Sequence, residues 1–475
     1  EIVKKIKKEK IFTDKLHTLA YGTDASFYRL IPKIVIKTDN AQEVQDIIEL
    51  SNKMNLSITF RAAGTSLSGQ AISDSILIVT SRNFSNFKIA DDISYISLQP
   101  ALTGAQVNGL LARYSKKIGP DPASINAAMI GGIAANNASG MCCGISQNSY
   151  KTLKSMKLIF GDGSKLDTGC EESKKEFRKT HENFLKELKS FSIDTKNNEE
   201  LRAKIERKYK IKNTCGYSLN ALIDFEDEFE ILEHLIIGSE GTLAFIEEIT
   251  YYTVEDLKDK ASTLIYFKDI KEACSAVTKL KLAKEANTIN VEAVELMDRA
   301  GLASIENDPA MPSYIKDFDE NVTALLIETR AISDEQLDIQ TRQIQDLLKE
   351  FSLKREMYFT KDVAEYTLYW KIRKGLFPAV GAVRVTGTTV IIEDVAYPIE
   401  HLAEATLELQ DLFKKHAYSE ALIFGHALEG NFHFVFTQDF SDPKEVKRYD
   451  DFMNDVVHSV AVKYQGSLKA EHGTG

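Results

Sequence analysis

A loop of small and hydroxyl-bearing residues runs Arg61-Ala62-Ala63-Gly64-Thr65-Ser66-Leu67-Ser68-Gly69. The sequence before it predicts a strand at 32–36, an amphipathic helix at 40–54 and a strand at 56–60, and a further apolar run follows at 76–79. This order is typical of a βαβ unit. Two glycines let backbone N–H groups approach an anionic phosphate closely, and the hydroxyls can donate to its oxygens. The loop therefore predicts a phosphate-binding site, with an ordinary turn as the alternative.

Neither of two better-known phosphate motifs fits this loop. A Walker loop needs Lys where this chain has Gln70, and no G-x-G-x-x-G follows the first predicted strand. Two more segments rich in small residues follow, Pro120-Asp121-Pro122-Ala123-Ser124 and residues 130–140. They allow close backbone contact with a large planar or phosphorylated ligand, and tight helix packing is the alternative. A third segment, 238–246, joins a predicted helix at 227–237 to a strand.

Two histidines flank a predicted hairpin turn near the end of the chain. His426 and His433 lie either side of Glu429-Gly430-Asn431, between apolar runs at 421–424 and 434–436. The pattern predicts strand, turn, strand, with both imidazoles near one end of the hairpin. Imidazole plus carboxylate suits a divalent ion such as Zn, Mn or Fe, and Glu471 offers a third ligand that leaves coordination positions open. A purely structural pair is the alternative, because nine histidines give some pairs by chance.

Composition bounds the class of protein. The chain has 475 residues, of which 43% are hydrophobic and 27% charged, enough for two or three globular domains. A net charge of −11 argues against a nucleic-acid partner. No apolar run is long enough to span a bilayer, and no secretory signal is visible. Lysines cluster at residues 1–19 and predict a basic N-terminal helix with a solvated face; contact with a membrane surface is the alternative.

The five cysteines lack any C-x-x-C spacing. An odd number without this spacing favours reduced thiols in a cytoplasmic compartment. It also supplies no ligand set for an iron–sulfur cluster within these residues.

The order of the motifs resembles the FAD domain of the vanillyl-alcohol oxidase/p-cresol methylhydroxylase (PCMH) family. Six segments carry this resemblance: 32–35, 61–69, 120–124, 131–140, 212–217 and 238–246. Four later segments resemble the D-2-hydroxyacid dehydrogenase branch, which includes D-lactate dehydrogenases, the flavin-binding component of glycolate oxidase and D-2-hydroxyglutarate dehydrogenases. They are Trp370-Lys371-Ile372-Arg373, 393–398, 425–433 and 471–473.

The resemblance covers about residues 20–475 and implies an α+β fold in two main parts. A two-part PCMH-type FAD-binding domain is expected at 20–253, with a charged helical insertion at 171–212. An α+β substrate domain with an antiparallel sheet is expected at 258–440. A C-terminal helix and an active-site segment follow at 441–475. The active site is expected where the domains meet.

The resemblance also assigns roles to single residues. His426, His433 and Glu471 match metal ligands, His472 matches a candidate base, and Arg373 matches a clamp for the substrate carboxylate, with a surface salt bridge as its alternative. Non-covalent FAD is expected, because no histidine occupies the loop at 61–69 where some relatives attach the cofactor. The residues expected to bind FAD are Arg61, Ala62, Ala63, Gly64, Thr65, Ser66, Ser68, Gly69, Pro120, Asp121, Ala123, Ser124, Gly131, Gly132, Asn136, Ser139, Gly140, Glu240, Gly241 and Ile246.

The implied activity is FAD-dependent oxidation of a small D-2-hydroxyacid to the 2-oxoacid. A divalent metal stabilises the developing alkoxide, an imidazole accepts the hydroxyl proton, and an arginine fixes the carboxylate. In the D-2-hydroxyglutarate branch the hairpin carries Asp-Gly-Asn and a further Asn just after its second His, where this chain has Glu429 and Val435. This difference favours a monocarboxylate such as D-lactate. D-2-hydroxyglutarate or glycolate oxidation, another enzyme of the same flavin fold, and a non-catalytic FAD-binding subunit are the alternatives.

The electron acceptor is expected to lie outside these residues. The long bacterial relatives continue into a cysteine-rich iron–sulfur region, so 4Fe-4S clusters are expected only in a part absent from this chain. The resemblance implies electron transfer to that region or to another respiratory acceptor. NAD is not expected, because no dinucleotide fingerprint is present. Peripheral association with the inner face of the cytoplasmic membrane is the alternative to a purely cytoplasmic location.

Overall fold

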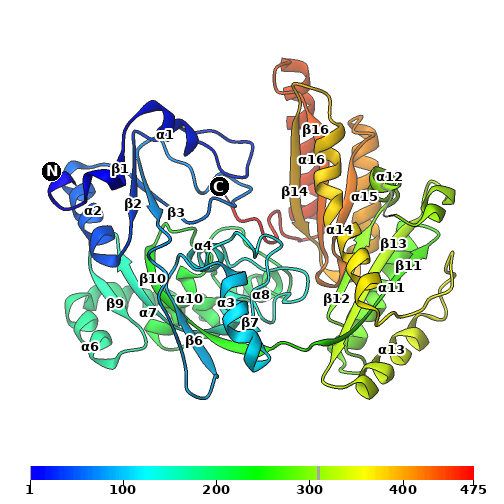
Figure 1. Cartoon of the computed structure of the whole chain (residues 1–475), viewed down its shortest axis with the longest axis horizontal. Coiled ribbons are helices and arrows are strands. Elements are labelled where there is room, and N and C mark those ends of the chain that lie inside the picture. Colours follow the sequence, from blue (N-terminus) through cyan, green and yellow to red (C-terminus); the bar gives the residue numbers. More distant parts are fainter. Residues whose placement is uncertain (1, 308–310, 475) are drawn as a thin grey trace. The chain divides into compact units, whose positions relative to one another are not determined.

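The computed structural model describes residues 2–307 and 311–474 (Figure 1). The chain forms two compact units. The N-terminal unit comprises residues 1–210, 214–256 and 471–475, and the C-terminal unit comprises residues 211–213 and 257–470. The last few residues of the chain therefore belong to the unit in which the chain begins.

A four-stranded sheet opens the N-terminal unit. Helix α2 (Ala41–Met54) connects two of its parallel strands, as the sequence predicts. The helix begins where the Asn40 side chain accepts the backbone N–H of Glu43, and its apolar face is buried at Val44, Ile47 and Ile48. The order of the strands in the sheet is β1 (Ile11–Phe12), β2 (Ile34–Thr38), β4 (Ile76–Thr80) and β3 (Ile58–Arg61).

A second, antiparallel sheet completes this unit. The long strand β10 (Ala244–Glu255) lies at its centre and pairs with three neighbours. The other strands are β5 (Phe87–Ile89), β6 (Tyr95–Leu98), β7 (Lys116–Ile118), β8 (Leu153–Phe160) and β9 (Lys165–Asp167). The helices of the unit are α1 (Lys15–Ala20), α3 (Gly104–Leu111), α4 (Ile130–Asn136), α5 (Ser149–Thr152), α6 (Glu171–Thr180), α7 (Glu182–Asn197), α8 (Glu199–Lys208), α9 (Ala221–Asp224) and α10 (Glu228–Ile236). Helices α6 to α8 confirm the predicted helical insertion.

Residues 2–19 do not form the single basic helix that the lysine pattern predicts. They form two short 3-10 turns, strand β1 and the start of α1. The reason is that both faces of the segment have partners. Ile6 is buried, Lys5 pairs with Asp46 at 2.7 Å, and Lys10 pairs with Glu43 at 2.6 Å. These contacts hold the segment against α2.

The C-terminal unit is built on one six-stranded antiparallel sheet, as the family resemblance implies. Side chains alternate between its two faces. On β13, Leu325 and Ile327 pack into one apolar core, whereas Ala324 and Leu326 pack into another. The strand order is β11 (Asp259–Phe267), β13 (Thr323–Ala331), β12 (Ala293–Met297), β15 (Leu422–His426), β16 (Asn431–Gln438) and β14 (Thr389–Ala396).

Helices cover both faces of this sheet (Figure 1). The first core packs against α11 (Ile270–Glu285), α13 (Asp334–Leu348), α15 (Leu402–Lys415) and α16 (Pro443–Val457). The second core packs against α12 (Arg299–Ile305) and α14 (Val363–Val383).

Two buried carboxylates anchor helix α14 to the sheet. Trp370 donates its indole N–H to Glu328 on β13 at 2.6 Å, and one turn later Arg373 donates from Nε to Glu295 on β12 at 2.7 Å. Burial opposes ionisation of Glu328, yet the charges of Arg330 and Lys260 hold its pKa below its ordinary value. The two bonds fix the rotation of α14, because residues three apart lie on the same side of a helix.

We expect Trp370→Phe to lower the free energy of unfolding by about 1 to 3 kcal/mol, because it removes a donor from a buried carboxylate but keeps an aromatic ring. Urea denaturation followed by far-ultraviolet circular dichroism measures this loss. An unchanged midpoint and slope would show that the bond contributes nothing to stability.

Candidate active site

A cavity of about 400 Å³ lies in the N-terminal unit. Segments distant in the sequence line it, namely the loop after β3, the region around α4, the start of β10 and the final segment with Glu471 and His472. The predicted FAD-binding residues among its lining are Arg61, Ala62, Ala63, Gly64, Thr65, Ser66, Ala123, Ser124, Gly131, Gly132, Asn136, Ser139, Glu240, Gly241 and Ile246.

The other predicted FAD-binding residues are not part of the lining. They are Ser68, Gly69, Pro120, Asp121 and Gly140. Asp121 shows what such a residue does, because its carboxylate accepts the backbone N–H groups of Cys142 and Cys143, each at 3.2 Å. It shapes the turn that follows the 130–140 segment.

Arg61 braces the loop from within. Its Nη1 donates to the backbone carbonyls of Tyr21, Thr23 and Ala71, at 3.4, 2.8 and 3.2 Å. Burial lowers the pKa of its guanidinium from the ordinary value. The side chain thus ties the start of the loop to its end and to the preceding segment.

Glu240 is a buried carboxyl group in the wall of the cavity. Its Oε1 accepts from the side-chain amides of Asn136, at 2.8 Å, and Gln70, at 3.3 Å. Burial raises its pKa to about 8, so the group keeps its proton at neutral pH. In the sequence Gln70 serves only to exclude a Walker loop, and no pattern predicts its contact with Glu240. Its position directly after the loop was the only available signal.

The final segment of the chain is held inside the same unit. The Gln70 amide donates to the His472 carbonyl at 3.0 Å, and the Gly473 N–H donates to Thr214 Oγ1 at 3.0 Å. Ser139 Oγ donates to Glu471 Oε2 at 3.4 Å. The predicted base and the predicted carboxylate ligand therefore lie in the wall of the cavity.

The two predicted histidine ligands are brought together in the C-terminal unit. His426 ends β15, His433 lies in β16, and their ring centroids are 5.3 Å apart. The predicted strand–turn–strand is confirmed. Gly430 makes the turn with a φ of +65°, and a Cβ there would lie 2.1 Å from the Tyr397 carbonyl oxygen. Both imidazoles are buried.

Glu295 links His426 to Arg373. One carboxylate oxygen lies 2.7 Å from His426 Nδ1, and the other accepts from Arg373 Nε. Burial opposes ionisation, yet the neighbouring His426 and Arg373 side chains hold the pKa of Glu295 below its ordinary value. A carboxylate at Nδ1 favours the tautomer with its lone pair on Nε2. Arg373 is buried, which excludes the alternative of a surface salt bridge.

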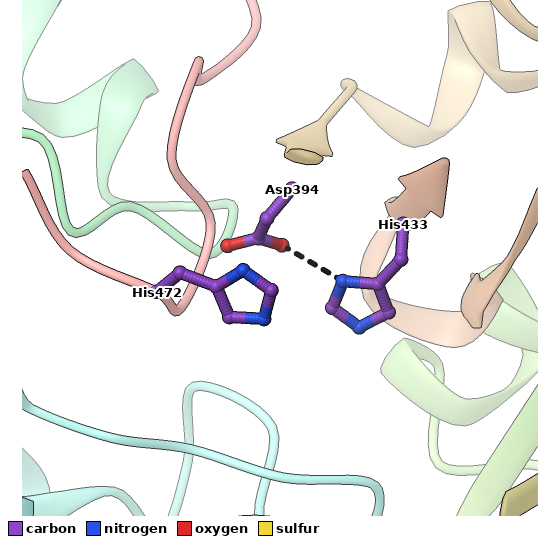
Figure 2. A group of neighbouring side chains, drawn as sticks. All are labelled: Asp394, His433 and His472. Atoms are coloured by element: carbon purple, nitrogen blue, oxygen red, sulfur yellow. Dashed lines mark ion pairs between the residues drawn. The ribbon is translucent and has the colours of Figure 1, made fainter. Parts of the chain in front are cut away.

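His433 has a carboxylate neighbour of its own. Asp394 on β14 lies directly opposite His433 in the sheet register, and its Oδ1 is 3.4 Å from Nδ1 (Figure 2). Asn431 donates to the same carboxylate oxygen at 2.7 Å. Imidazoles that bind metals typically pair their other nitrogen with a carboxylate, so the donor chemistry fits a metal ion. Glu471 belongs to the N-terminal unit, and the complete three-ligand set stays a prediction.

The sequence patterns do not predict either carboxylate partner. Asp394 lies in the segment 393–398, and Glu295 is a charged residue inside the apolar run of β12. A lone carboxylate in a buried strand requires a partner, which was the available signal.

Two family models match the chain. Residues 32–169 match "FAD binding domain", and residues 257–475 match "FAD linked oxidases, C-terminal domain". The first covers the loop at 61–69 and the 130–140 segment, and the second covers the histidine hairpin. The chain therefore carries an FAD binding domain and the C-terminal domain of FAD linked oxidases, which confirms the resemblance predicted from its motifs.

Curated relatives match nearly the whole chain at low identity. D-2-hydroxyglutarate dehydrogenase of Haemophilus influenzae is 24% identical, and the match covers 98% of this chain and 46% of the relative. Glycolate oxidase subunit GlcD of Escherichia coli is 25% identical, with 97% and 80% covered. D-lactate dehydrogenase (cytochrome), mitochondrial, of Arabidopsis thaliana is 24% identical, with 94% and 67% covered. The chain spans about half the length of the D-2-hydroxyglutarate dehydrogenases that it matches.

Solved structures establish the fold. p-Cresol methylhydroxylase with substrate bound has a TM-score of 0.67 at 13% identity, and the match covers 99% of this chain and 88% of that one. Alkyldihydroxyacetonephosphate synthase has a TM-score of 0.67 at 14% identity, with 98% and 80% covered. The predicted PCMH-type α+β fold is confirmed. None of the described helices has the length and apolar character needed to cross a membrane.

We expect the stability contribution of Glu240 to depend on pH. The unfolded carboxyl titrates near its ordinary value, about 4.3, and the folded one near 8. Between these values the folded chain holds a proton that the unfolded chain has released, so the free energy of unfolding falls as pH rises. Glu240→Gln removes this pH-dependent contribution to the free energy of unfolding. Its melting temperature, relative to that of the unaltered chain without FAD, should therefore rise between about pH 5 and pH 8.

Glu187→Gln is the matched control, because Glu187 is exposed on α7 in the same unit. The difference in melting temperature between Glu187→Gln and the unaltered chain should stay constant across this pH range. A constant difference for Glu240→Gln as well would contradict the raised pKa.

Proposed function

We propose that this chain is the flavin-bearing part of a dehydrogenase that oxidises a small D-2-hydroxyacid, with D-lactate as the best candidate, to the 2-oxoacid. The observation that carries the proposal is the pair of buried histidines, each with a carboxylate at Nδ1, on a chain with an FAD binding domain. A flavin oxidase without metal assistance needs no such pair. The relatives named for D-lactate, glycolate and D-2-hydroxyglutarate support a 2-hydroxyacid substrate.

The cavity residues fit non-covalent FAD. Thr65 and Ser66 supply hydroxyl donors, and the loop around them holds no histidine. At Gly132 a Cβ would lie 3.3 Å from that of Ala62, and both residues line the cavity, so the missing side chain keeps it open. FAD, when bound, supplies the acceptor for the substrate hydride.

His426 and His433, together with Glu471, are the residues proposed to hold a divalent metal. A Zn or Mn ion suits two imidazoles and a carboxylate, and Fe is a further candidate. Such an ion, when bound, stabilises a developing alkoxide by several kcal/mol. Glu295 and Asp394 orient the two imidazoles, a role that typically accounts for about 10- to 100-fold in metal affinity.

Arg373 and His472 are proposed to act on the substrate itself. The Glu295 bond to Nε, together with the Phe424 ring 4.4 Å from the guanidinium carbon, fixes the plane of Arg373. A planar fork fixed in this way suits a carboxylate. The role proposed for the His472 imidazole is to take the hydroxyl proton, because an imidazole can accept a proton near neutral pH.

The preference for a monocarboxylate rests on the two hairpin positions that differ from the D-2-hydroxyglutarate branch, Glu429 and Val435. Glu429 pairs with Lys281 at 3.3 Å, and Val435 is buried in the apolar core. Neither side chain offers a donor for a second carboxylate. D-2-hydroxyglutarate is the second candidate, because several relatives carry that name. We further propose that electrons leave the flavin for an iron–sulfur region or another respiratory acceptor beyond these residues.

Flavin bleaching tests the proposed activity. The purified chain should be yellow and should release free FAD on acid denaturation. Anaerobic D-lactate should bleach the flavin, and turnover should need an artificial dye as acceptor. Glycolate and D-2-hydroxyglutarate test the substrate, and L-lactate is the control of opposite configuration. A flavin that none of these acids reduces, or rapid turnover with NAD as sole acceptor, would contradict the proposal.

The metal is tested separately from the flavin. His433→Ala should lose the metal and most of the hydroxyacid oxidation but keep FAD. His472→Ala should keep both metal and FAD, and flavin reduction should slow by about 10²- to 10⁴-fold. The control is His416→Ala, because His416 pairs with Asp455 at 2.6 Å in the same unit. Full activity in a metal-free His433→Ala protein would refute the metal site.

A further inference from the structure

The Gln70 amide lies in the cavity wall, and its contacts reach three separate parts of the N-terminal unit. Its Nε2 donates to Glu240 Oε1 at 3.3 Å and to the His472 carbonyl at 3.0 Å. Its Oε1 accepts from the hydroxyl of Ser66 in the loop. Both ends of the amide are engaged, so its orientation is set by its partners.

Glu240 is itself held in place. Asn136 Nδ2 donates to the same carboxyl oxygen at 2.8 Å, and Glu240 adopts a left-handed backbone conformation with a φ of +54°. A residue other than glycine rarely adopts this conformation unless its surroundings fix it. The carboxyl oxygen is thus a fixed acceptor for the Gln70 amide.

The Gly473 backbone packs closely against the side chains of Gln70, Asn136 and Glu240. Gly473 has a φ of +75°, and a Cβ there would lie 2.1 Å from Glu240 Oε1, 2.6 Å from Asn136 Nδ2 and 2.7 Å from Gln70 Nε2. Only a residue without a side chain can approach so closely. The Gly473 N–H donates to Thr214 Oγ1 at 3.0 Å, which fixes the other side of the segment.

We infer that Gln70, Asn136 and Glu240 form a seat for the His472–Gly473 backbone and that Gln70 is a positioning residue for the His472 imidazole. This inference rests on the proposed function, in which His472 accepts the substrate proton. A general base must lie within hydrogen-bond reach of the proton it removes, and a misplacement of about 1 Å can cost about 10²-fold in rate. The seat contributes through His472 and needs no contact with the substrate.

The test compares Gln70→Leu with Gln45→Leu. Gln45 is a matched control, because its side chain donates to the Gly163 carbonyl at 2.8 Å in the same unit but does not line the cavity. Three quantities are measured on the purified chain with FAD: the FAD and metal content, the rate of flavin reduction as a function of D-lactate concentration, and hydrogen exchange at the Gly473 amide.

We expect Gln70→Leu to keep its FAD and metal, with an unchanged D-lactate concentration for half-maximal rate. The limiting rate of flavin reduction should fall by about 10²-fold. Exchange at the Gly473 amide should be faster than in the unaltered chain, while Gln45→Leu should match the unaltered chain in every respect. A limiting rate within twofold of the unaltered chain, or a fall explained by lost FAD, would overturn the seat.

Failure of the proposed function is a separate result. If no hydroxyacid bleaches the flavin of the unaltered chain, the seat is judged by hydrogen exchange alone. Faster exchange at Gly473 in Gln70→Leu then supports the seat, and equal exchange overturns it. If Gln70→Leu does not fold, Gln70→Glu takes its place, because it keeps the size of the side chain and replaces the N–H donor with oxygen.

Discussion

The desolvation of Glu295 is the constraint on which the C-terminal unit depends. A carboxylate buried in a sheet costs several kcal/mol unless charged or hydrogen-bonding partners compensate for the lost water. Arg373 and His426 are these partners, at 2.7 Å each. The carboxylate therefore determines how α14 lies on the sheet and how the His426 ring is turned. Breaking either contact would leave a buried charge with fewer partners, so stability and site geometry depend on the same group.

The N-terminal unit handles a buried carboxyl in the opposite way. Glu240 accepts hydrogen bonds from neutral amides, and burial raises its pKa, whereas the neighbouring His426 and Arg373 lower the pKa of Glu295. One residue type thus serves two purposes, because the neighbours decide the protonation state. A neutral carboxyl suits a cavity predicted to receive an anionic pyrophosphate, since an ionised group there would repel it. An ionised carboxylate suits Glu295, which orients the Arg373 guanidinium and the His426 imidazole.

Local patterns predicted the local structure well. The α2 segment and the histidine hairpin follow from periodicity and turn chemistry, and the helical insertion and the antiparallel sheet follow from the family resemblance. The same local patterns did not predict the partners that orient the predicted site residues. Glu295 is 131 residues from His426, and Gln70 is 402 residues from His472, so no local signal joins them. The helix predicted for the lysine-rich N-terminal segment was wrong for a similar reason. The partners of Lys5 and Lys10 lie on α2, more than thirty residues along the chain.

The segment at 212–217 contains residues of both units. Lys212 is only 2% exposed and belongs to the C-terminal unit, where its charge helps to lower the pKa of Glu295. Two residues later, Thr214 belongs to the N-terminal unit and accepts the Gly473 N–H. This short run therefore supplies a cation near the Glu295 carboxylate and an acceptor for the Gly473 backbone. The run thus has a structural role in each unit, although neither Lys212 nor Thr214 lines the cavity.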